Sequence, residues 1–197
     1  MVHLIEQWRI GWNRNAFDIL PVALYCPFCA TLAAVQQTIG GPTPMTRYWL
    51  MKSEPNECSI DDALAAPKKT VPWTGVRNYQ ARNFMRDDMR VGDGVLFYHS
   101  SCPEPGIAGI ARVASSVRPD PTQFDARSDY VDPKSDPADP RWLLVDVQAK
   151  RKTRLLGLPE LRADAALADL ILLRRGNRLS ITPVDKAHWD HIVALLG

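Results

Sequence analysis

The pattern of apolar and polar positions in residues 45–197 predicts short strands interspersed with short helices. Residues 47–51 alternate aromatic and apolar side chains without a helical period, which is typical of a strand buried on both faces. Similar runs predict four further strands, at residues 95–98, 107–117, 142–148 and 178–182. Residues that favour helix N-caps precede three amphipathic segments: Ser59, Asn78 and Asp185. This mixed order predicts an α+β fold, a small, bent β-barrel of about five to six strands with surrounding helices.

Three features between these elements add detail to the prediction. Gly109 lies inside an apolar run, where a glycine is expected if the sheet bends or another chain segment packs closely. Residues 118–141 contain five prolines and no apolar period, which predicts a long loop of the kind that often lines a site. The charge run at residues 150–154 follows a predicted strand, and such runs usually mark solvated turns.

Residues 1–44 differ in character from the rest of the chain. They contain few charged residues, and residues 16–35 are mostly apolar but are interrupted by Asp18, Pro21 and Pro27, so they make a poor membrane span. We interpret residues 1–44 as a poorly ordered N-terminal extension or as sequence upstream of a natural start at Met45, with a cleaved signal peptide as the alternative. Residues 45–197 then form one domain.

Composition excludes several classes of protein. With 197 residues, 46% apolar residues and a formal net charge of +2, the chain is typical of a globular protein and lacks the strongly basic balance of one held on DNA by charge alone. Cys26 and Cys29 have the spacing of a thioredoxin-like motif, but no βαβ pattern follows them. Cys58 and Cys102 stand alone, so no second ligand pair for zinc is present. We expect a cytoplasmic protein without membrane contact, metal or cofactor.

Polar and aromatic residues gather where the apolar runs stop. Such clusters occupy residues 52–55, 73–78 and 97–100, each at the end of a predicted element. A flat ring beside a few fixed donors and acceptors suits a pocket for a planar heterocycle, and a nucleobase is the commonest of these. The sequence therefore predicts a base-binding pocket rather than a reaction centre.

The same clusters resemble a known family. The matching motifs, in chain order, are residues 48–55 (YWLMKSEP), 73–83 (WTGVRNYQARN), 91–93 (VGD), 97–100 (FYHS) and 178–184 (RLSITPV). Together they resemble the EVE domain, the family of thymocyte nuclear protein and its small bacterial relatives, over residues 47–197. The resemblance does not extend to residues 1–44.

The resemblance implies a PUA-like fold, related to the YTH domains that cage a methylated adenine between tryptophans. It also implies a nucleic-acid partner, DNA or RNA, that carries a modified base, with modified cytosine as the expected one. An alternative remains from another class: a small-molecule-binding enzyme or accessory protein that holds a nucleoside or cofactor in the same pocket. The oligomeric state is left open.

Nine residues are expected to form the pocket: Lys52, Ser53, Trp73, Gly75, Val76, Arg77, Asn78, Tyr98 and Ser100. Trp73 would be a stacking wall, or else a ring that covers the end of the barrel. Asn78 would contact the ligand or, as the preferred interpretation, cap its helix. Glu54 would accept from an exocyclic amine or pair with Arg77.

Four basic residues are weaker candidates for phosphate contacts: Lys150, Lys152, Arg174 and Arg175. The motifs of P-loop proteins, of serine hydrolases with a nucleophile elbow, of HExxH metalloproteases and of zinc deaminases are absent from the sequence. We therefore predict no catalytic residue, and a module that binds nucleic acid without reacting with it.

Overall fold

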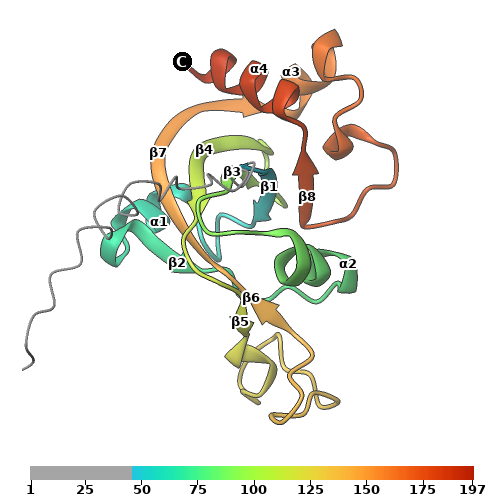
Figure 1. Cartoon of the computed structure of the whole chain (residues 1–197). Coiled ribbons are helices and arrows are strands. Elements are labelled where there is room, and N and C mark those ends of the chain that lie inside the picture. Colours follow the sequence, from blue (N-terminus) through green and yellow to red (C-terminus); the bar gives the residue numbers. More distant parts are fainter. Residues whose placement is uncertain (1–45) are drawn as a thin grey trace, which may run out of the picture. The chain divides into compact units, whose positions relative to one another are not determined.

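Six strands build one strongly curved sheet in the computed structural model, which describes residues 46–197 (Figure 1). The strand order is β2-β7-β4-β3-β1-β8, and β5 and β6 form a separate two-stranded sheet. The strands are β1 (Tyr48–Ser53), β2 (Thr70–Pro72), β3 (Gly94–His99), β4 (Gly106–Val113), β5 (Arg118–Pro119), β6 (Leu143–Leu144), β7 (Asp146–Gly157) and β8 (Ile181–Val184). The helices are α1 (Ile60–Ala65), α2 (Tyr79–Asn83), α3 (Leu158–Ala163) and α4 (Lys186–Leu196), and single turns lie at Pro67–Lys69, Phe84–Asp88, Pro121–Gln123, Ala165–Leu167 and Ile171–Leu173.

The sheet confirms the α+β class, but it does not close into a barrel. Strands β2 and β8 remain its two edges, so the expected barrel is corrected to an open, bent sheet. Strand β7 pairs with both β2 and β4, and Figure 1 shows it as a long orange arc around the other strands. The register between β4 and β7 shifts after Ile107 and again after Ile110, and such irregularities increase bend and twist.

Gly109 lies where the sheet meets α1, as its position in the sequence predicts. A Cβ on Gly109 would stand 2.6 Å from Cγ1 of Ile60 and 2.8 Å from the carbonyl oxygen of Arg151. No larger residue fits between these groups unless one of them moves. The glycine therefore lets α1 pack directly on the middle of the sheet.

The sheet separates two hydrophobic cores. Alternation along β1 sends Trp49 and Met51 to the first core and Leu50 to the second. Helices α1 and α2 cover the first core, while α3 and α4 cover the second (Figure 1). The prediction of a strand buried on both faces is confirmed, because Trp49, Leu50 and Met51 are all buried.

Local sequence signals explain where two of the helices begin. The Ser59 hydroxyl accepts from the backbone N–H of Asp62, and the Asp62 carboxylate accepts from the N–H of Ser59 in return. The Asn78 side-chain oxygen accepts from the N–H groups of Gln80 and Ala81. Asp185 precedes α4 as predicted, but its side chain makes no capping hydrogen bond.

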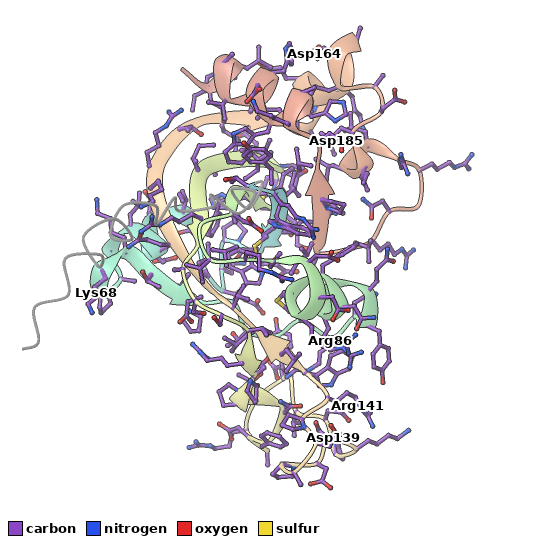
Figure 2. The ribbon with its side chains drawn as sticks, viewed as in Figure 1. Lys68, Arg86, Asp139, Arg141, Asp164 and Asp185 are labelled. Atoms are coloured by element: carbon purple, nitrogen blue, oxygen red, sulfur yellow. The ribbon has the colours of Figure 1, made fainter. Side chains whose placement is uncertain are left out.

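A side-chain contact joins α4 to the residue that follows α3. His191 of α4 contacts Asp164 across 2.7 Å between Nε2 and Oδ2. Figure 2 shows Asp164 and Asp185 at the end that carries α3 and α4, and Asp139 and Arg141 in the loop region at the other end of the described residues.

The charge run at residues 150–154 corrects a sequence prediction. It does not form a turn: β7 continues through it to Gly157 and remains paired with β4. Lys150, Lys152 and Arg154 alternate along the exposed side of this strand. Ladder hydrogen bonds to β4 therefore outweigh the low strand propensity of the charged residues.

The expected N-terminal extension (residues 1–44) and its Cys26–Cys29 motif lie outside the described residues. Cys58 and Cys102 are free thiols. Within residues 46–197, no helix has both the length and the apolar character required to cross a membrane.

Candidate functional site

A cavity of about 590 Å³ opens at the carboxyl ends of β1 and β3. These two strands are parallel neighbours, so their polar ends, Ser53 and His99, lie side by side. We call this space the first cavity; its lining residues are Lys52, Ser53, Glu54, Glu57, Cys58, Pro72, Trp73, Thr74, Gly75, Val76, Ser100, Ser101, Tyr130, Arg178 and Ser180. Its volume falls in the ordinary range of ligand pockets.

The structure brings six of the nine predicted pocket residues into this cavity. They are Lys52, Ser53, Trp73, Gly75, Val76 and Ser100. Arg77, Asn78 and Tyr98 do not line it. The polar ends of β1 and β3 and the loop after β2 therefore converge as the sequence predicts.

Trp73 lines the cavity but is not a freely exposed ring. Its exposed fraction is 6%, and it belongs to the first hydrophobic core. The ring meets Phe97 edge-on, with 5.2 Å between the ring centroids, and the backbone N–H donates to the carbonyl of Val145 at 2.9 Å. Trp73 is therefore a core residue that also lines the cavity, and its role as a stacking wall stays a prediction.

Tyr130 supplies a second ring that sequence reasoning missed. A Cβ on Gly75 would meet its Cζ at 2.8 Å, and Gly75 has a positive φ of 79°, so glycine is required there on both counts. The Tyr130 hydroxyl donates to Oε1 of Glu57 at 2.5 Å. That hydrogen bond and burial raise the pKa of Tyr130 to about 12. Only the length of the loop at residues 118–141 indicated that it reaches the site.

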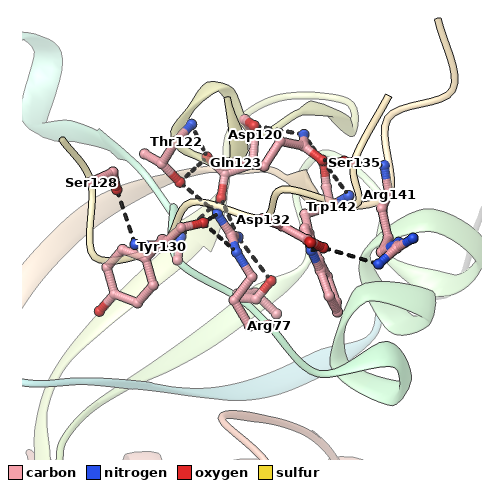
Figure 3. Close-up of polar contacts among 12 residues, drawn as sticks. Arg77, Asp120, Thr122, Gln123, Ser128, Tyr130, Asp132, Ser135, Arg141 and Trp142 are labelled. Carbon is pink, nitrogen blue, oxygen red and sulfur yellow. Dashed lines mark hydrogen bonds and ion pairs between the residues drawn. The ribbon is translucent and has the colours of Figure 1, made fainter. Parts of the chain in front are cut away.

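Arg77, one of the nine predicted pocket residues, does not line the first cavity, and its side chain is engaged by other residues. Its Nη1 donates to Oδ2 of Asp120 at 2.8 Å, its Nη2 donates to the Thr122 hydroxyl, and its guanidinium also donates to the carbonyl of Tyr130 (Figure 3). The sequence offered Glu54 as a possible partner of Arg77, but Arg77 pairs with Asp120 instead. Arg77 thus fastens the long loop that carries Tyr130.

Asp120 is the buried counterpart of that arginine. Its side chain has no exposed surface, and its Oδ2 also accepts from the backbone N–H of Gly75. Burial alone would raise the pKa of Asp120, but the hydrogen bonds from Arg77, Thr122 and Gly75 outweigh it and hold the pKa below its usual range. The contact with Gly75 links the anchored loop directly to the wall of the first cavity.

The preferred interpretation of Asn78, as the cap of α2, is confirmed. Its side-chain oxygen is occupied in capping α2, so the structure supports its role as a helix cap. Ser53 lines the cavity, yet its hydroxyl donates to the carbonyl of Cys58 at 2.6 Å. Burial raises the pKa of the Cys58 thiol, so the thiol stays protonated at neutral pH.

Several polar side chains in the first cavity remain available to a ligand. The side chains that make no hydrogen bond or ion pair within residues 46–197 are Lys52, Glu54, Thr74, Ser101, Arg178 and Ser180. Lys52 and Arg178 provide donors, and Glu54 provides an acceptor. Burial lowers the pKa of Lys52 from its ordinary value.

A second cavity of about 360 Å³ adjoins the first and shares Lys52, Ser100 and Ser101 with it. Alternation along β3 explains the division: Tyr98 points to the second core and lines the second cavity, whereas His99 points toward α1 and accepts from the N–H of Ile60. The other lining residues are Pro105, Leu158, Arg162, Leu172, Leu173, Arg174, Arg175, Gly176 and Asn177.

The four predicted phosphate-contact residues separate into two groups. Arg174 and Arg175 line the second cavity. Lys150 and Lys152 lie on β7 and line neither cavity, and Lys152 is paired with Asp61 at 2.7 Å. Among residues 46–197, no group of three or more His, Cys, Asp or Glu side chains is placed to hold a metal ion.

Known proteins resemble this chain over nearly all of the described residues. The EVE domain matches residues 47–195. Human thymocyte nuclear protein 1 is 40% identical over 169 residues, which cover 77% of this chain and 74% of that protein. A crystal structure of a Pseudomonas putida protein is 49% identical with a TM-score of 0.72, covering 76% of this chain and 99% of that one.

A further solved structure carries information on a ligand. The human THYN1 protein in complex with DNA that contains 5-methylcytosine is 40% identical, with a TM-score of 0.72, and the match covers 76% of this chain and 97% of that one. The motifs at the ends of β1, β2 and β3 indicate the same family as these relatives. On this agreement of sequence and fold, the chain belongs to the EVE domain family.

Proposed function

We propose that this protein is a non-catalytic reader that accepts one modified cytosine of a nucleic-acid strand in the first cavity. The observation that carries the proposal is the composition of that cavity. It brings Trp73 and Tyr130 together with unpaired donors and acceptors near the ends of two parallel strands. Ring faces and edges bind a base of any sequence, while the fixed polar groups select among bases.

The human relative supports the choice of base. The THYN1 structure contains DNA with 5-methylcytosine, and it matches this chain along 97% of its own length. The corresponding cavity residues therefore lie within the matched region. DNA is for this reason the first nucleic acid to test, with RNA second.

The free polar groups suit the edge of a cytosine. Cytosine presents an amino donor at N4 beside acceptors at N3 and O2, and a carboxylate is the usual partner of that amino group. Glu54 offers a carboxylate, and Lys52 and Arg178 offer donors for the two acceptors. Thymine presents an acceptor where cytosine has its amino group, so Glu54 would repel it.

A base inside a duplex must leave the stack to enter this cavity. Extrusion costs a few kcal/mol, whereas stacking on aromatic residues returns about 1–3 kcal/mol per base. Single strands and distorted duplexes should therefore bind more tightly than regular duplex of the same sequence.

The proposal of a non-catalytic role rests on the state of the reactive groups. The Cys58 thiol has a raised pKa, and the His99 imidazole accepts from a backbone N–H and does not line the cavity. Neither the Cys58 thiol nor the His99 imidazole is therefore an activated nucleophile or base that faces the cavity. A cytoplasmic location stays a prediction of the sequence, and the name of the human relative points to the nucleus instead.

Fluorescence anisotropy with labelled single-stranded oligonucleotides tests the proposal. The oligonucleotides differ only in one central base, which is 5-methylcytosine, cytosine or thymine. We expect the tightest binding for 5-methylcytosine and the weakest for thymine. Equal affinity for all three would overturn the proposed recognition of a modified cytosine.

A thermal-shift screen separates the reader from the alternative, a protein that binds a free nucleoside or cofactor. The screen compares 5-methyl-2′-deoxycytidine with the modified oligonucleotide at equal concentration. A reader should be stabilised much more by the oligonucleotide, because the backbone adds contacts. Stabilisation by the nucleoside alone would favour the small-molecule alternative.

A further inference from the structure

The second cavity concentrates positive charge next to the first. Lys52, Arg162, Arg174 and Arg175 line it, and no aspartate or glutamate does. The first cavity, in contrast, balances Lys52 and Arg178 against two glutamates. The two adjoining spaces therefore differ in the charge of the ligand that they suit.

These cations have no partner among the described residues. Within residues 46–197, the side chains of Lys52, Arg162, Arg174 and Arg175 make no ion pair or hydrogen bond. Arg154 on β7, in contrast, is paired with Glu160 at 2.7 Å. Four unpaired cations around one cavity repel one another, and an anion would relieve that repulsion.

Tyr98 provides a neutral donor at the same place. It is 3% exposed, it lines the second cavity, and its hydroxyl makes no hydrogen bond within residues 46–197. Within residues 46–197, only the Thr182 hydroxyl oxygen is both buried and without a hydrogen bond. The Tyr98 hydroxyl has no hydrogen bond either, so it is not fully buried. The Tyr98 hydroxyl is therefore open to the cavity, where it can donate a hydrogen bond to a ligand.

The two cavities meet at the strand ends. Lys52 and Ser100, at the ends of β1 and β3, line both spaces. Successive residues of each strand point to opposite faces of the sheet. The strand ends therefore separate the first cavity, which contains rings and balanced charge, from the cationic second cavity. A nucleotide has the same arrangement, because its base and its phosphate lie on opposite sides of the sugar.

We propose that the second cavity is a phosphate subsite that holds the backbone phosphate next to the base bound in the first cavity. This inference rests on the proposed function. Arg174 and Arg175 contact the phosphate oxygens, Tyr98 donates a neutral hydrogen bond, and Lys52 stands between the phosphate and the base. Tyr98, expected from the sequence to bind the base, is thereby assigned to the phosphate.

Salt-dependent binding of a single-stranded oligonucleotide with one 5-methylcytosine tests the subsite. The Arg174→Ala/Arg175→Ala protein should bind about tenfold more weakly, because hydrogen bonds to charged groups are removed. The slope of log affinity against log salt should fall by about 0.7 for each phosphate that the protein no longer neutralises. The unmodified oligonucleotide should lose affinity by the same factor, so the preference for 5-methylcytosine survives.

Two further variants make the test specific. Tyr98→Phe removes one neutral donor and should weaken binding while leaving the salt slope unchanged. Lys150→Ala/Lys152→Ala also removes two positive charges, but from β7. It should change the affinity and the salt slope less than Arg174→Ala/Arg175→Ala does. Arg162→Gln supplies an independent loss of charge at the subsite if the double arginine variant does not fold.

The outcomes separate the two proposals. The phosphate subsite is overturned if the arginine variants bind with the affinity and salt slope of the β7 variant. It is likewise overturned if Tyr98→Phe binds as tightly as the unchanged protein. The proposed function fails separately, if the unchanged protein does not distinguish 5-methylcytosine from cytosine.

Discussion

Arg77 and Asp120 form the ion pair that fixes one wall of the first cavity. They are 43 positions apart, and Nη1 of the arginine lies 2.8 Å from Oδ2 of the aspartate, whose side chain is completely buried. The same carboxylate accepts from the N–H of Gly75, and the same guanidinium contacts the backbone of Tyr130. One pair thus joins the loop after β2 to the long loop of residues 118–141.

Replacing Arg77 should detach that loop. Arg77→Met leaves the Asp120 carboxylate buried without its cation, a loss that typically costs about 3–5 kcal/mol. We expect a lower free energy of unfolding in urea and faster amide exchange in residues 118–141. Arg82→Met, a matched change of a half-buried arginine with no ion pair to a residue of 46–197, should cost less. Equal costs for both variants would contradict the anchoring role.

Acid should weaken the protein through Asp120. The native-state pKa of this carboxyl is below its usual range, so the stability that it contributes is present above its unfolded pKa of about 3.9. That stability is lost as the pH falls through the lower, native-state pKa. In Asp120→Asn, the free energy of unfolding should start lower at neutral pH and fall less steeply below about pH 4. Parallel pH profiles for the two proteins would contradict this.

Trp73 should affect both stability and binding. Because the ring is buried, Trp73→Ala should lower the free energy of unfolding by about 3–5 kcal/mol. Trp73→Phe keeps an aromatic ring and should fold, yet it should bind the 5-methylcytosine oligonucleotide more weakly. Tyr79→Ala is the control, because Tyr79 is 53% exposed and lies outside the first cavity. Unchanged affinity in Trp73→Phe would remove the ring from the proposed site.

Glu54 should determine the discrimination between two methylated pyrimidines. Thymine and 5-methylcytosine carry the same methyl group and differ at the group on C4. Glu54→Gln can offer its amide donor to the thymine oxygen, so the variant should lose most of the preference for 5-methylcytosine over thymine. Anisotropy with the two oligonucleotides measures the ratio of affinities. Glu104→Gln is the control, because Glu104 is exposed and lines neither cavity.

Features that depend on neighbours in the chain were predictable from the sequence. The capping box of Ser59 and Asp62, the cap of Asn78 and the double burial of residues 49–51 all follow from local patterns. The convergence of the polar clusters at residues 52–55 and 97–100 was also predictable, since both close a strand. Family membership rested on these same motifs.

Features that depend on contacts between distant segments were not predictable from the sequence. The extension of β7 through the charge run at residues 150–154 arises from pairing with β4, which outweighs the local preference of lysine and arginine. The open edges of the sheet likewise follow from which strands pair. The partner of Arg77 could not be read from the chain, because many carboxylates were equally available to it.

The sequence by itself therefore determined the family, the main elements and six residues of the first cavity, because local periodicity and short motifs encode them. Tertiary structure alone decided that Tyr130 lines the first cavity and bonds to Glu57, which is 73 positions away in the sequence. It also decided that Trp73 is buried and that Tyr98 faces the second cavity with Arg174 and Arg175. The physical reason is that burial and charge pairing depend on which segments meet in space, and that is fixed only when the sheet is assembled.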